Sequence, residues 1–349
     1  MRRFATISLA ALAAVLSLVS CERGRRSEPQ PAEQVTIGFS VATDTFIIER
    51  WNKDIKIFTG AARSLGAEVI FQLSAGGTQA QIDQIKYLLG QDIDILVVLP
   101  HDTALLAGVI KQANDRRIPV IAYDRLIQGV PITAYVSFDN EEVGRLFGRA
   151  LTSRVPRGNY LIVNGSVRDN NSFLVNTGLH EIIDPYAKSG QIRIVDELWL
   201  EEWSSDEATV KIREVLERTT DIQAISAAND QLANAAIQLL AERRMAGSVA
   251  VVGQDADLLS CQRVVEGLQL MTVYKPIERL ASRAAKIAVE IAQGRMPEPD
   301  RHMDNGSGVP VPFYMEPPQA VFASNMRETV IRDGFHAESD VYRNVAEYQ

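Results

Sequence analysis

Residues 120–140 read VIAYDRLIQGVPITAYVSFDN. The stretch contains two short apolar runs, 120–123 and 134–138, and each run ends in a pair of polar residues. Such runs predict strands that are buried on both faces, as in a parallel sheet covered by helices. In open sheets of this kind the ligand crevice lies outside the carboxyl ends of the strands. We therefore expect the polar pairs to face a binding site.

The same alternation of strand and helix signals runs through most of the chain. Ten strands are more than a single sheet usually holds. Before and after Phe138 the sequence shows the same succession of strand, polar turn and amphipathic helix. The sequence therefore predicts an α/β protein with two lobes, each built on a doubly wound parallel sheet. The predicted strands are 35–40, 68–73, 93–99, 120–123, 134–138, 160–164, 192–198, 224–228, 248–253 and 269–273, and the predicted helices are 47–65, 79–90, 103–116, 141–153, 172–183, 205–218, 230–243, 257–266 and 276–293.

The residues that follow the predicted strands suit the recognition of a sugar. A sugar hydroxyl both donates and accepts hydrogen bonds, so carboxylates and amides are best combined with cationic donors. Asp124 beside Arg125 could fix two adjacent hydroxyls, or could be a surface ion pair. Polar or aromatic side chains follow seven strands: Asp124-Arg125, Asp139-Asn140, Asn170-Asn171, Trp203, Asn229-Asp230, Asp255 and Lys275.

Two tryptophans are candidates for the aromatic wall that a sugar ring needs, because the C–H faces of the ring are apolar. Trp203 lies in a polar loop, where burial in a core is less natural. Trp51 lies near the start of the first predicted helix and could instead belong to the core.

The sequence lacks the common sequence motifs of hydrolytic and phosphoryl-transfer enzymes. It has no phosphate-binding glycine loop, no HExxH and no GxSxG, and its 4 histidines are scattered. The pair Asp255 and Asp257 lacks the oxygen donors of a calcium loop, and Asp257 is more simply a helix N-cap. Cys261 reads as a buried apolar residue. We therefore expect a binding protein that is not an enzyme and has no metal or cofactor.

The N-terminus carries an export signal. Residues 1–20 combine two arginines with a short apolar run, which is typical of a signal peptide. The sequence Leu18-Val19-Ser20-Cys21 resembles the lipobox of bacterial lipoproteins, in which the cysteine is acylated; an ordinary cleaved signal is the alternative. Residues 21–34 read as a flexible tether. Removing residues 1–20 takes the formal charge from -8 to -10, which argues against a nucleic-acid partner.

Seven short sequence motifs resemble those of a known protein family. Taken in order across residues 35–336, the chain resembles the ribose/galactose-type (type I) periplasmic binding proteins of bacterial ABC transporters. The blocks are Arg50-Trp51, Ala122-Tyr123-Asp124-Arg125, Ser137-Phe138-Asp139-Asn140-Glu141, Asp169-Asn170-Asn171, Ala228-Asn229-Asp230, Gly253-Gln254-Asp255-Ala256-Asp257 and Met271-Thr272-Val273-Tyr274-Lys275-Pro276.

The resemblance implies a fold and a set of roles. Two lobes, 35–138 plus 276–305 and 139–275 plus 306–336, would be joined by a three-crossover hinge and close on the ligand, leaving a tail at 337–349. Trp51 and Trp203 would stack on the two faces of the sugar. The residues expected to bind hydroxyls are Arg50, Asp124, Arg125, Asn140, Asn171, Asn229, Asp255 and Lys275.

The resemblance also implies partners. The ligand would be a monosaccharide, D-xylose first, delivered to an ABC permease by a monomeric, lipid-anchored protein outside the cytoplasm. The alternative is a sensor subunit that docks on a membrane histidine kinase or a chemoreceptor. Repressors built on the same lobes begin with a DNA-binding helix-turn-helix, but here a signal peptide stands in its place.

Overall fold

The computed structural model describes residues 34–42 and 48–346, with side chains from residue 50 onward after the gap. The predicted signal peptide, Cys21 and the tether up to residue 33 lie outside the described residues. From Val35 onward the chain forms one compact unit. Within this described part, no helix combines the length and the apolar character needed to cross a membrane.

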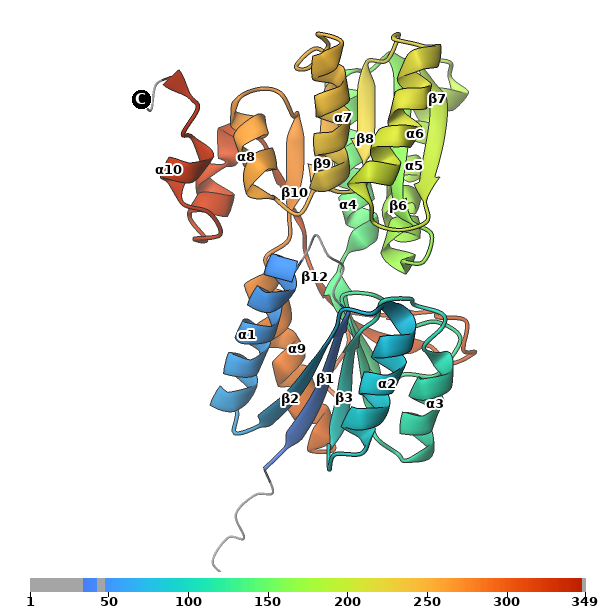
Figure 1. Ribbon diagram of the computed structural model, residues 1–349, viewed down its shortest axis with the longest axis vertical. Coiled ribbons are helices and arrows are strands. Elements are labelled where there is room, and N and C mark those ends of the chain that lie inside the picture. The colour runs from blue at the N-terminus through green and yellow to red at the C-terminus, as the bar shows by residue number, and fades with distance from the viewer. Residues whose placement is uncertain (1–33, 43–47, 347–349) are drawn as a thin grey trace, which may run out of the picture. The chain divides into compact units, whose positions relative to one another are not determined.

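The first lobe is built on a seven-stranded sheet (Figure 1). Its strand order is β11-β12-β5-β4-β3-β1-β2, and all neighbours are parallel except β11 and β12. The direction of strand order reverses at β1 and β3, which is where ligands bind in doubly wound folds. The strands are β1 (Thr36–Ala42), β2 (Glu68–Ser74), β3 (Ile95–Leu99), β4 (Val120–Tyr123), β5 (Ala134–Phe138), β11 (Arg301–Met303) and β12 (Val311–Glu316).

The second lobe repeats this plan in a six-stranded sheet. Its order, β13-β10-β9-β8-β6-β7, matches the order β12-β5-β4-β3-β1-β2 of the first sheet, with β6 in the place of β1, and β11 has no counterpart. Only β13 is antiparallel to its neighbour. The strands are β6 (Gly158–Ser166), β7 (Ile192–Leu200), β8 (Ala224–Ala227), β9 (Ala250–Gln254), β10 (Met271–Tyr274) and β13 (Gln319–Val321).

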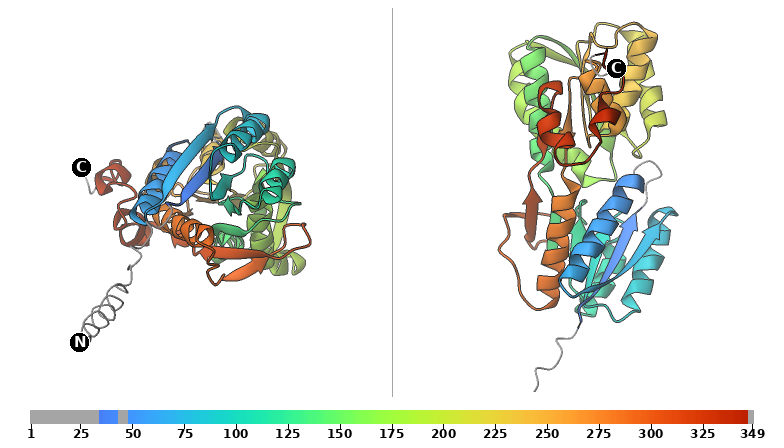
Figure 2. Two further views of the ribbon diagram at one scale, coloured as in Figure 1. Left: turned by 90° about the horizontal axis from the view of Figure 1, so that it is seen from below. Right: turned by 90° about the vertical axis from the view of Figure 1, so that its left-hand side faces the viewer.

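Helices cover both faces of each sheet. In the first lobe, α1 (Ile48–Ser64) and α9 (Ile277–Ala292) lie side by side on one face, as Figure 2 shows. The other face packs against α2 (Gly77–Leu89) and α3 (Ala107–Asp115). In the second lobe one face packs against α6 and α7 and the other against α4 and α5. Their bounds are α4 (Asn140–Arg154), α5 (Asn170–Lys188), α6 (Ser205–Arg218) and α7 (Asp230–Glu242).

The helix starts follow the signals in the sequence. The Ser204 hydroxyl accepts a hydrogen bond from the Glu207 amide at 3.2 Å and begins α6. The Asn229 side chain accepts from the Leu232 amide at 2.9 Å and begins α7. Both residues satisfy an amide that the helix itself leaves unpaired. Ser204 and Asn229 are therefore the N-caps of α6 and α7.

Three connections join the lobes, as expected. They run from β5 to α4, from β10 to α9, and from β12 to β13. The third differs from the predicted boundary at 305 and 306, because β12 pairs in parallel with β5 of the first sheet. Residues 306–316 therefore belong to the first lobe, and the chain returns to the second lobe only after Glu316.

The C-terminal segment is more ordered than the sequence indicates. After β13 the chain forms short turns at Ala323–Asn325 and Arg327–Ile331, and then α10 (Glu338–Val341). Val341 and Tyr342 are buried in a cluster with Cys261 of α8 (Leu258–Val265). The predicted tail from residue 337 thus packs on the second lobe as far as it is described, and Cys261 is the buried apolar residue that was expected.

Candidate functional site

The carboxyl ends of strands from both sheets meet around one cavity. All ten residues that the sequence predicts for the site line it, so the structure brings the whole predicted set together. They are Arg50, Trp51, Asp124, Arg125, Asn140, Asn171, Trp203, Asn229, Asp255 and Lys275, and they are joined by Asp169 and Gln254.

Two aspartates occupy equivalent places in the two lobes. Asp124 follows β4, and its amide donates to the Val136 carbonyl at 2.8 Å; Asp255 follows β9, and its amide donates to the Val273 carbonyl at 2.8 Å. Both have positive backbone angles, φ 63° and φ 101°, which side-chain-bearing residues rarely adopt. Strain of this kind persists where the surroundings enforce it, commonly at ligand sites. Each lobe therefore presents one carboxylate from a turn with positive φ at an equivalent place in its sheet.

Arg50 connects the carboxylates of the site. Its guanidinium forms a close ion pair with Asp124 and lies 3.6 Å from Asp255 and 3.9 Å from Asp54. The same group lies 4.3 Å from the centre of the Trp51 ring, stacked on its face. Arg50 thus lies over one face of the Trp51 ring while it pairs with the carboxylates.

Lys275 belongs to the same ion-pair cluster. Its ammonium lies 2.8 Å from Asp255, in the connection between β10 and α9. It is buried, and its ammonium lies 5.9 Å from the centre of the ring of Phe138, the last residue of β5 before the connection to α4. Lys275 thus lies in one of the three connections between the lobes.

Hydrogen bonds cross from one lobe to the other at this site. The Asn171 side-chain amide donates to the Asp124 carbonyl at 3.0 Å, and the Tyr135 hydroxyl donates to the Asn171 carbonyl oxygen at 3.2 Å. Arg125 pairs with Asp169 at 2.9 Å. Because all of these groups are buried, their interactions are stronger than the same pairs would be in water.

Trp203 is oriented by Asp169. Its indole N–H donates to the Asp169 carboxylate at 3.1 Å. The ring packs so closely on Gly165 that a side chain at that position would come within 2.2 Å of it. Trp203 is half-buried, whereas Trp51 is 1 % exposed and also belongs to the core of the first lobe. Trp51 therefore packs in the core of the first lobe and also lines the cavity, so both interpretations of this residue hold.

Burial and ion pairing set the charge state of the site. Burial acts to raise the pKa of Asp124, but Arg50, Lys275 and Arg125 together hold that pKa below its ordinary value. Burial raises the pKa of Asp169, with Arg125 opposing it. Burial raises the pKa of Asp54 to about 7, against the opposing effects of Arg50 and Tyr123. Cations and carboxylates nearly balance, which suits a neutral ligand rich in hydroxyls.

The space between these side chains is small. The cavity measures about 30 Å³.

Asp169, Gln254 and Asp54 were not predicted for the site. Asp169 caps α5 by accepting from the Asn171 amide at 2.9 Å, and its position directly before Asn170-Asn171 was the available signal. Gln254 ends β9, and its side chain donates to the Ala228 carbonyl at 2.6 Å. Asp54 lies four residues after Arg50 in the same predicted helix. Residues at this spacing share one face of a helix, so the position of Asp54 beside Arg50 could have been predicted. Among the described residues, no cluster of His, Cys, Asp and Glu could hold a metal ion.

This combination of fold and site defines a class: two-lobed α/β binding proteins that enclose a ligand between lobes joined by three connections. Residues 38–296 match the family described as the periplasmic binding protein domain. The chain belongs to this family. Members of this family are binding proteins that work outside the cytoplasm. The prediction of a binding protein rather than an enzyme is therefore confirmed. The prediction of a location outside the cytoplasm is confirmed as well.

Two curated relatives are similar to nearly the whole chain. The D-xylose-binding periplasmic protein of Haemophilus influenzae is 41% identical over 312 residues, which cover 89% of this chain and 93% of the relative. The D-xylose-binding periplasmic protein of Escherichia coli is 42% identical over the same length, with the same coverage.

A solved structure has the same fold. The carbohydrate transporter solute binding protein from Chloroflexus aurantiacus, in complex with D-glucose, superimposes with a TM-score of 0.81 at 27% identity. The comparison covers 88% of this chain and 98% of that chain. The predicted fold class is confirmed.

Proposed function

We propose that this protein captures D-xylose, or a closely related monosaccharide, between its two lobes and delivers it to an ABC permease as a monomer. The observation that carries the proposal is the convergence of ten sugar-type residues on one cavity. The two relatives that are more than 40% identical are both named for D-xylose. That similarity supports xylose ahead of other sugars.

The arrangement suggests how a sugar is held. Asp124 with Arg125 from one lobe, and Asp255 with Lys275 from the other, offer a carboxylate acceptor beside a cationic donor on each side. Asn140, Asn171 and Asn229 add amides that can both donate and accept. Trp51 and Trp203 supply apolar faces for the ring.

The mechanism is binding with no chemical step. The sugar lies between Trp51 and Trp203 and connects the two lobes through its hydroxyls, which Arg50 and the other polar side chains of the site bind. A ligand shifts the equilibrium between open and closed forms only by contacts that differ between them. Contacts to both lobes at once exist only in the closed form, so the sugar stabilises closure.

Calorimetric titration of the purified protein tests this function. We expect xylose to bind one per chain and Trp203→Ala to weaken binding about fivefold or more, since stacking on an aromatic ring contributes on the order of 1 kcal/mol. Trp199→Ala is the matched control, because Trp199 stacks on Phe173 at 4.8 Å and does not line the cavity. Equal losses in the two variants would contradict the proposed role of Trp203.

We also propose that Cys21 carries a lipid that anchors the protein to a membrane. The proposal is supported by the Leu18-Val19-Ser20-Cys21 sequence that follows the apolar run. Mass spectrometry of the mature N-terminal peptide should find acylated Cys21, and Cys21→Ser should release the protein from the membrane fraction. An unmodified mature N-terminus, with the protein free of the membrane, would favour an ordinary cleaved signal.

A further inference from the structure

Loops of the two lobes meet beside the sugar site. The first lobe contributes the loops after β3 and β4, and the second contributes the loop between β6 and α5. Residues 168–171 of this last loop each form a hydrogen bond or an ion pair with the first lobe. Of these four described residues, Asp169 and Asn171 line the sugar cavity, and Arg168 and Asn170 do not. The contacts of Arg168 and Asn170 therefore serve something other than direct contact with a sugar.

Arg168 and Asn170 are bonded to Thr103 and Gln128 of the first lobe. The Gln128 side-chain amide donates to the Asn170 side-chain carbonyl oxygen at 2.6 Å. The Thr103 amide donates to the Arg168 carbonyl at 3.3 Å, and the Thr103 hydroxyl donates to the same oxygen at 3.2 Å. These four residues are here called the clasp. All four are described by the structure, and none of them lines the sugar cavity.

Each half of the clasp is held in place within its own lobe. In the first lobe the Thr103 carbonyl accepts from the Gln128 amide at 2.7 Å, which joins the loops after β3 and β4. In the second lobe the Arg168 amide donates to the Ser166 hydroxyl at 3.1 Å, and the Arg168 guanidinium pairs with Glu202 at 2.6 Å. The two halves are therefore positioned before the lobes meet.

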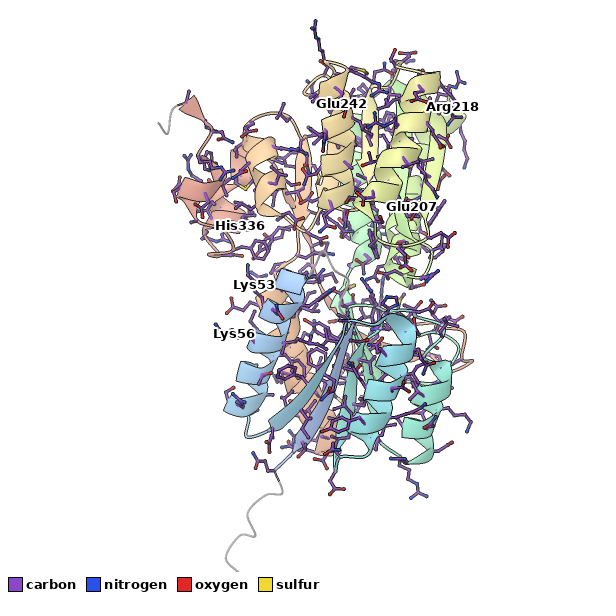
Figure 3. All side chains as sticks on the ribbon, viewed as in Figure 1. Lys53, Lys56, Glu207, Arg218, Glu242 and His336 are labelled. Carbon is purple, nitrogen blue, oxygen red and sulfur yellow. The ribbon has the colours of Figure 1, made fainter. Side chains whose placement is uncertain are left out.

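The clasp lies outside the connections that join the lobes. Its residues follow β3, β4 and β6, whereas the three connections run from β5 to α4, from β10 to α9 and from β12 to β13. In Figure 3, side chains of both lobes reach into the space between them. A hydrogen bond between the lobes that lies outside these connections breaks when the lobes separate. The bonds of the clasp therefore exist only in the closed form.

Contacts of this kind change the affinity for a ligand that they do not touch. When a ligand binds only one form of a protein, the apparent Kd is the intrinsic Kd divided by the fraction of the protein in that form. The clasp increases the closed fraction by the same factor whichever sugar is present. By contrast, a residue that bonds to a particular hydroxyl affects different sugars unequally.

We infer that Thr103, Gln128 and Asn170 set the affinity for the sugar without touching it, because they stabilise the closed form. This inference rests on the proposed function, in which the sugar is enclosed between the lobes. The three are positioning residues, since they hold the loop that carries Asp169 and Asn171 against the first lobe. Selectivity between sugars is left to the residues that line the cavity.

Calorimetric titrations of Gln128→Ala test the inference. We expect the affinity for xylose to fall about 2- to 10-fold, because one hydrogen bond of the closed form is lost. The second-tightest binder among ribose, arabinose, glucose and galactose should lose the same factor, so the ratio of the two affinities should stay within about 1.5-fold of that of the wild type. Unchanged affinities, or a changed ratio, would overturn the inference and leave the proposed function intact. Absence of sugar binding by the wild type would overturn both.

A double-mutant cycle assigns the effect to the bond between the lobes. Asn170→Ala should weaken xylose binding as much as Gln128→Ala does, and the double variant should lose no more than either single variant, because all three lack the same bond. Additive losses would show that the two residues act separately and would overturn the inference.

Gln84→Ala is the matched control for these variants. The Gln84 side-chain amide donates to the Leu73 carbonyl at 2.7 Å, and both residues belong to the first lobe. This bond is the same in the open and closed forms, so we expect the affinity for xylose to change less than about 1.5-fold. A loss equal to that of Gln128→Ala would show that closure is not the cause and would contradict the role of the clasp.

Discussion

At the scale of single residues, the two strained aspartates are the clearest sign of a binding site. Asp124 and Asp255 are both held at positive φ, and each has a cation at its carboxylate. A surface ion pair, the alternative reading of Asp124 and Arg125, is excluded by burial, since these residues are 4 % and 3 % exposed. A buried carboxylate that a ligand must share with Arg50 is suited to discriminate between hydroxyl patterns.

Replacement of Asp124 by asparagine should reveal this role. Asparagine tolerates positive φ, so the turn is kept while the charge is lost. We expect Asp124→Asn to weaken xylose binding about 10- to 100-fold, because a hydrogen bond to a charged group contributes roughly 1.5–3 kcal/mol. Calorimetric titration measures the loss. Asp115→Asn is the control, because Asp115 is an exposed aspartate paired with Lys111, and similar losses in both variants would contradict the prediction.

Asp54 should make stability depend on pH. Burial raises its pKa to about 7, whereas an aspartate in the unfolded chain has a pKa of about 3.9. Between these values the folded protein keeps a proton that the unfolded chain has lost. The free energy of unfolding should therefore fall as the pH rises from about 4 to about 7, through the contribution of Asp54.

Asp54→Asn should remove that contribution. Between about pH 5 and about pH 8, we expect the free energy of unfolding of the wild type to fall further than that of the variant, by on the order of 2 kcal/mol. An asparagine oxygen can still accept from the Tyr123 hydroxyl, which bonds to Asp54 in the wild type. Urea unfolding at the two pH values measures the difference, and parallel pH dependences would show that Asp54 is not the group responsible.

The residues of the site were largely predictable because each lies at the end of a strand or the start of a helix. Asp169 and Gln254 were missed, since their roles depend on contacts with Arg125, Trp203 and Ala228 that are distant in sequence. The position of Arg50 on Trp51, and its reach to Asp255, are likewise products of packing between the lobes. Such contacts leave no periodic signal in the chain.

At the scale of elements, the packing of α4 on α5 depends on two glycines. A side-chain carbon at Gly144 would lie 1.9 Å from the Val175 carbonyl, and one at Gly178 would lie 1.9 Å from the Glu141 carbonyl. Both contacts are with backbone, which cannot rotate away. The two helices therefore approach closely only because both positions lack a side chain.

Gly144→Ala should destabilise the fold for this reason. We expect the free energy of unfolding to drop by about 1–3 kcal/mol or more, since overpacking forces the backbone to shift. Gly108 of α3 is a matched control, because a side-chain carbon there would meet nothing within 4 Å. Gly108→Ala should be neutral or stabilising by up to about 1 kcal/mol. Urea unfolding of both variants measures these effects, and equal destabilisation would contradict the packing argument.

Most elements followed from the hydrophobic pattern, but three strands did not. Strand β12 contains Pro312, which argues against a strand in a sequence. In the structure Pro312 lies opposite His302 of β11, and the pairing with β5 begins only at Phe313. Strands β11 and β13 have 3 residues each, too few for alternation to be visible. A short strand is defined by its partner in the sheet, which sequence alone does not reveal.

At the scale of the whole molecule, two copies of one sheet order bring their ligand-binding ends to a single site. In each sheet the strand order reverses at the equivalent place, between β1 and β3 and between β6 and β8. Neither lobe alone completes the site, because Arg50 and Asp124 come from the first, and Trp203 and Asp255 from the second. Binding and closure are therefore expected to be one linked event.

The measurement that most directly tests sugar capture is a titration of the purified protein with xylose, ribose, arabinose, glucose, galactose and allose, run beside thermal unfolding with each sugar. A ligand that binds only the folded state raises the melting temperature by mass action. We predict that xylose binds most tightly and gives the largest shift, and that 2-deoxy sugars bind poorly because buried polar groups would lose their partners. Absence of binding and of any shift with all of these sugars, in a folded protein, would contradict the proposed function.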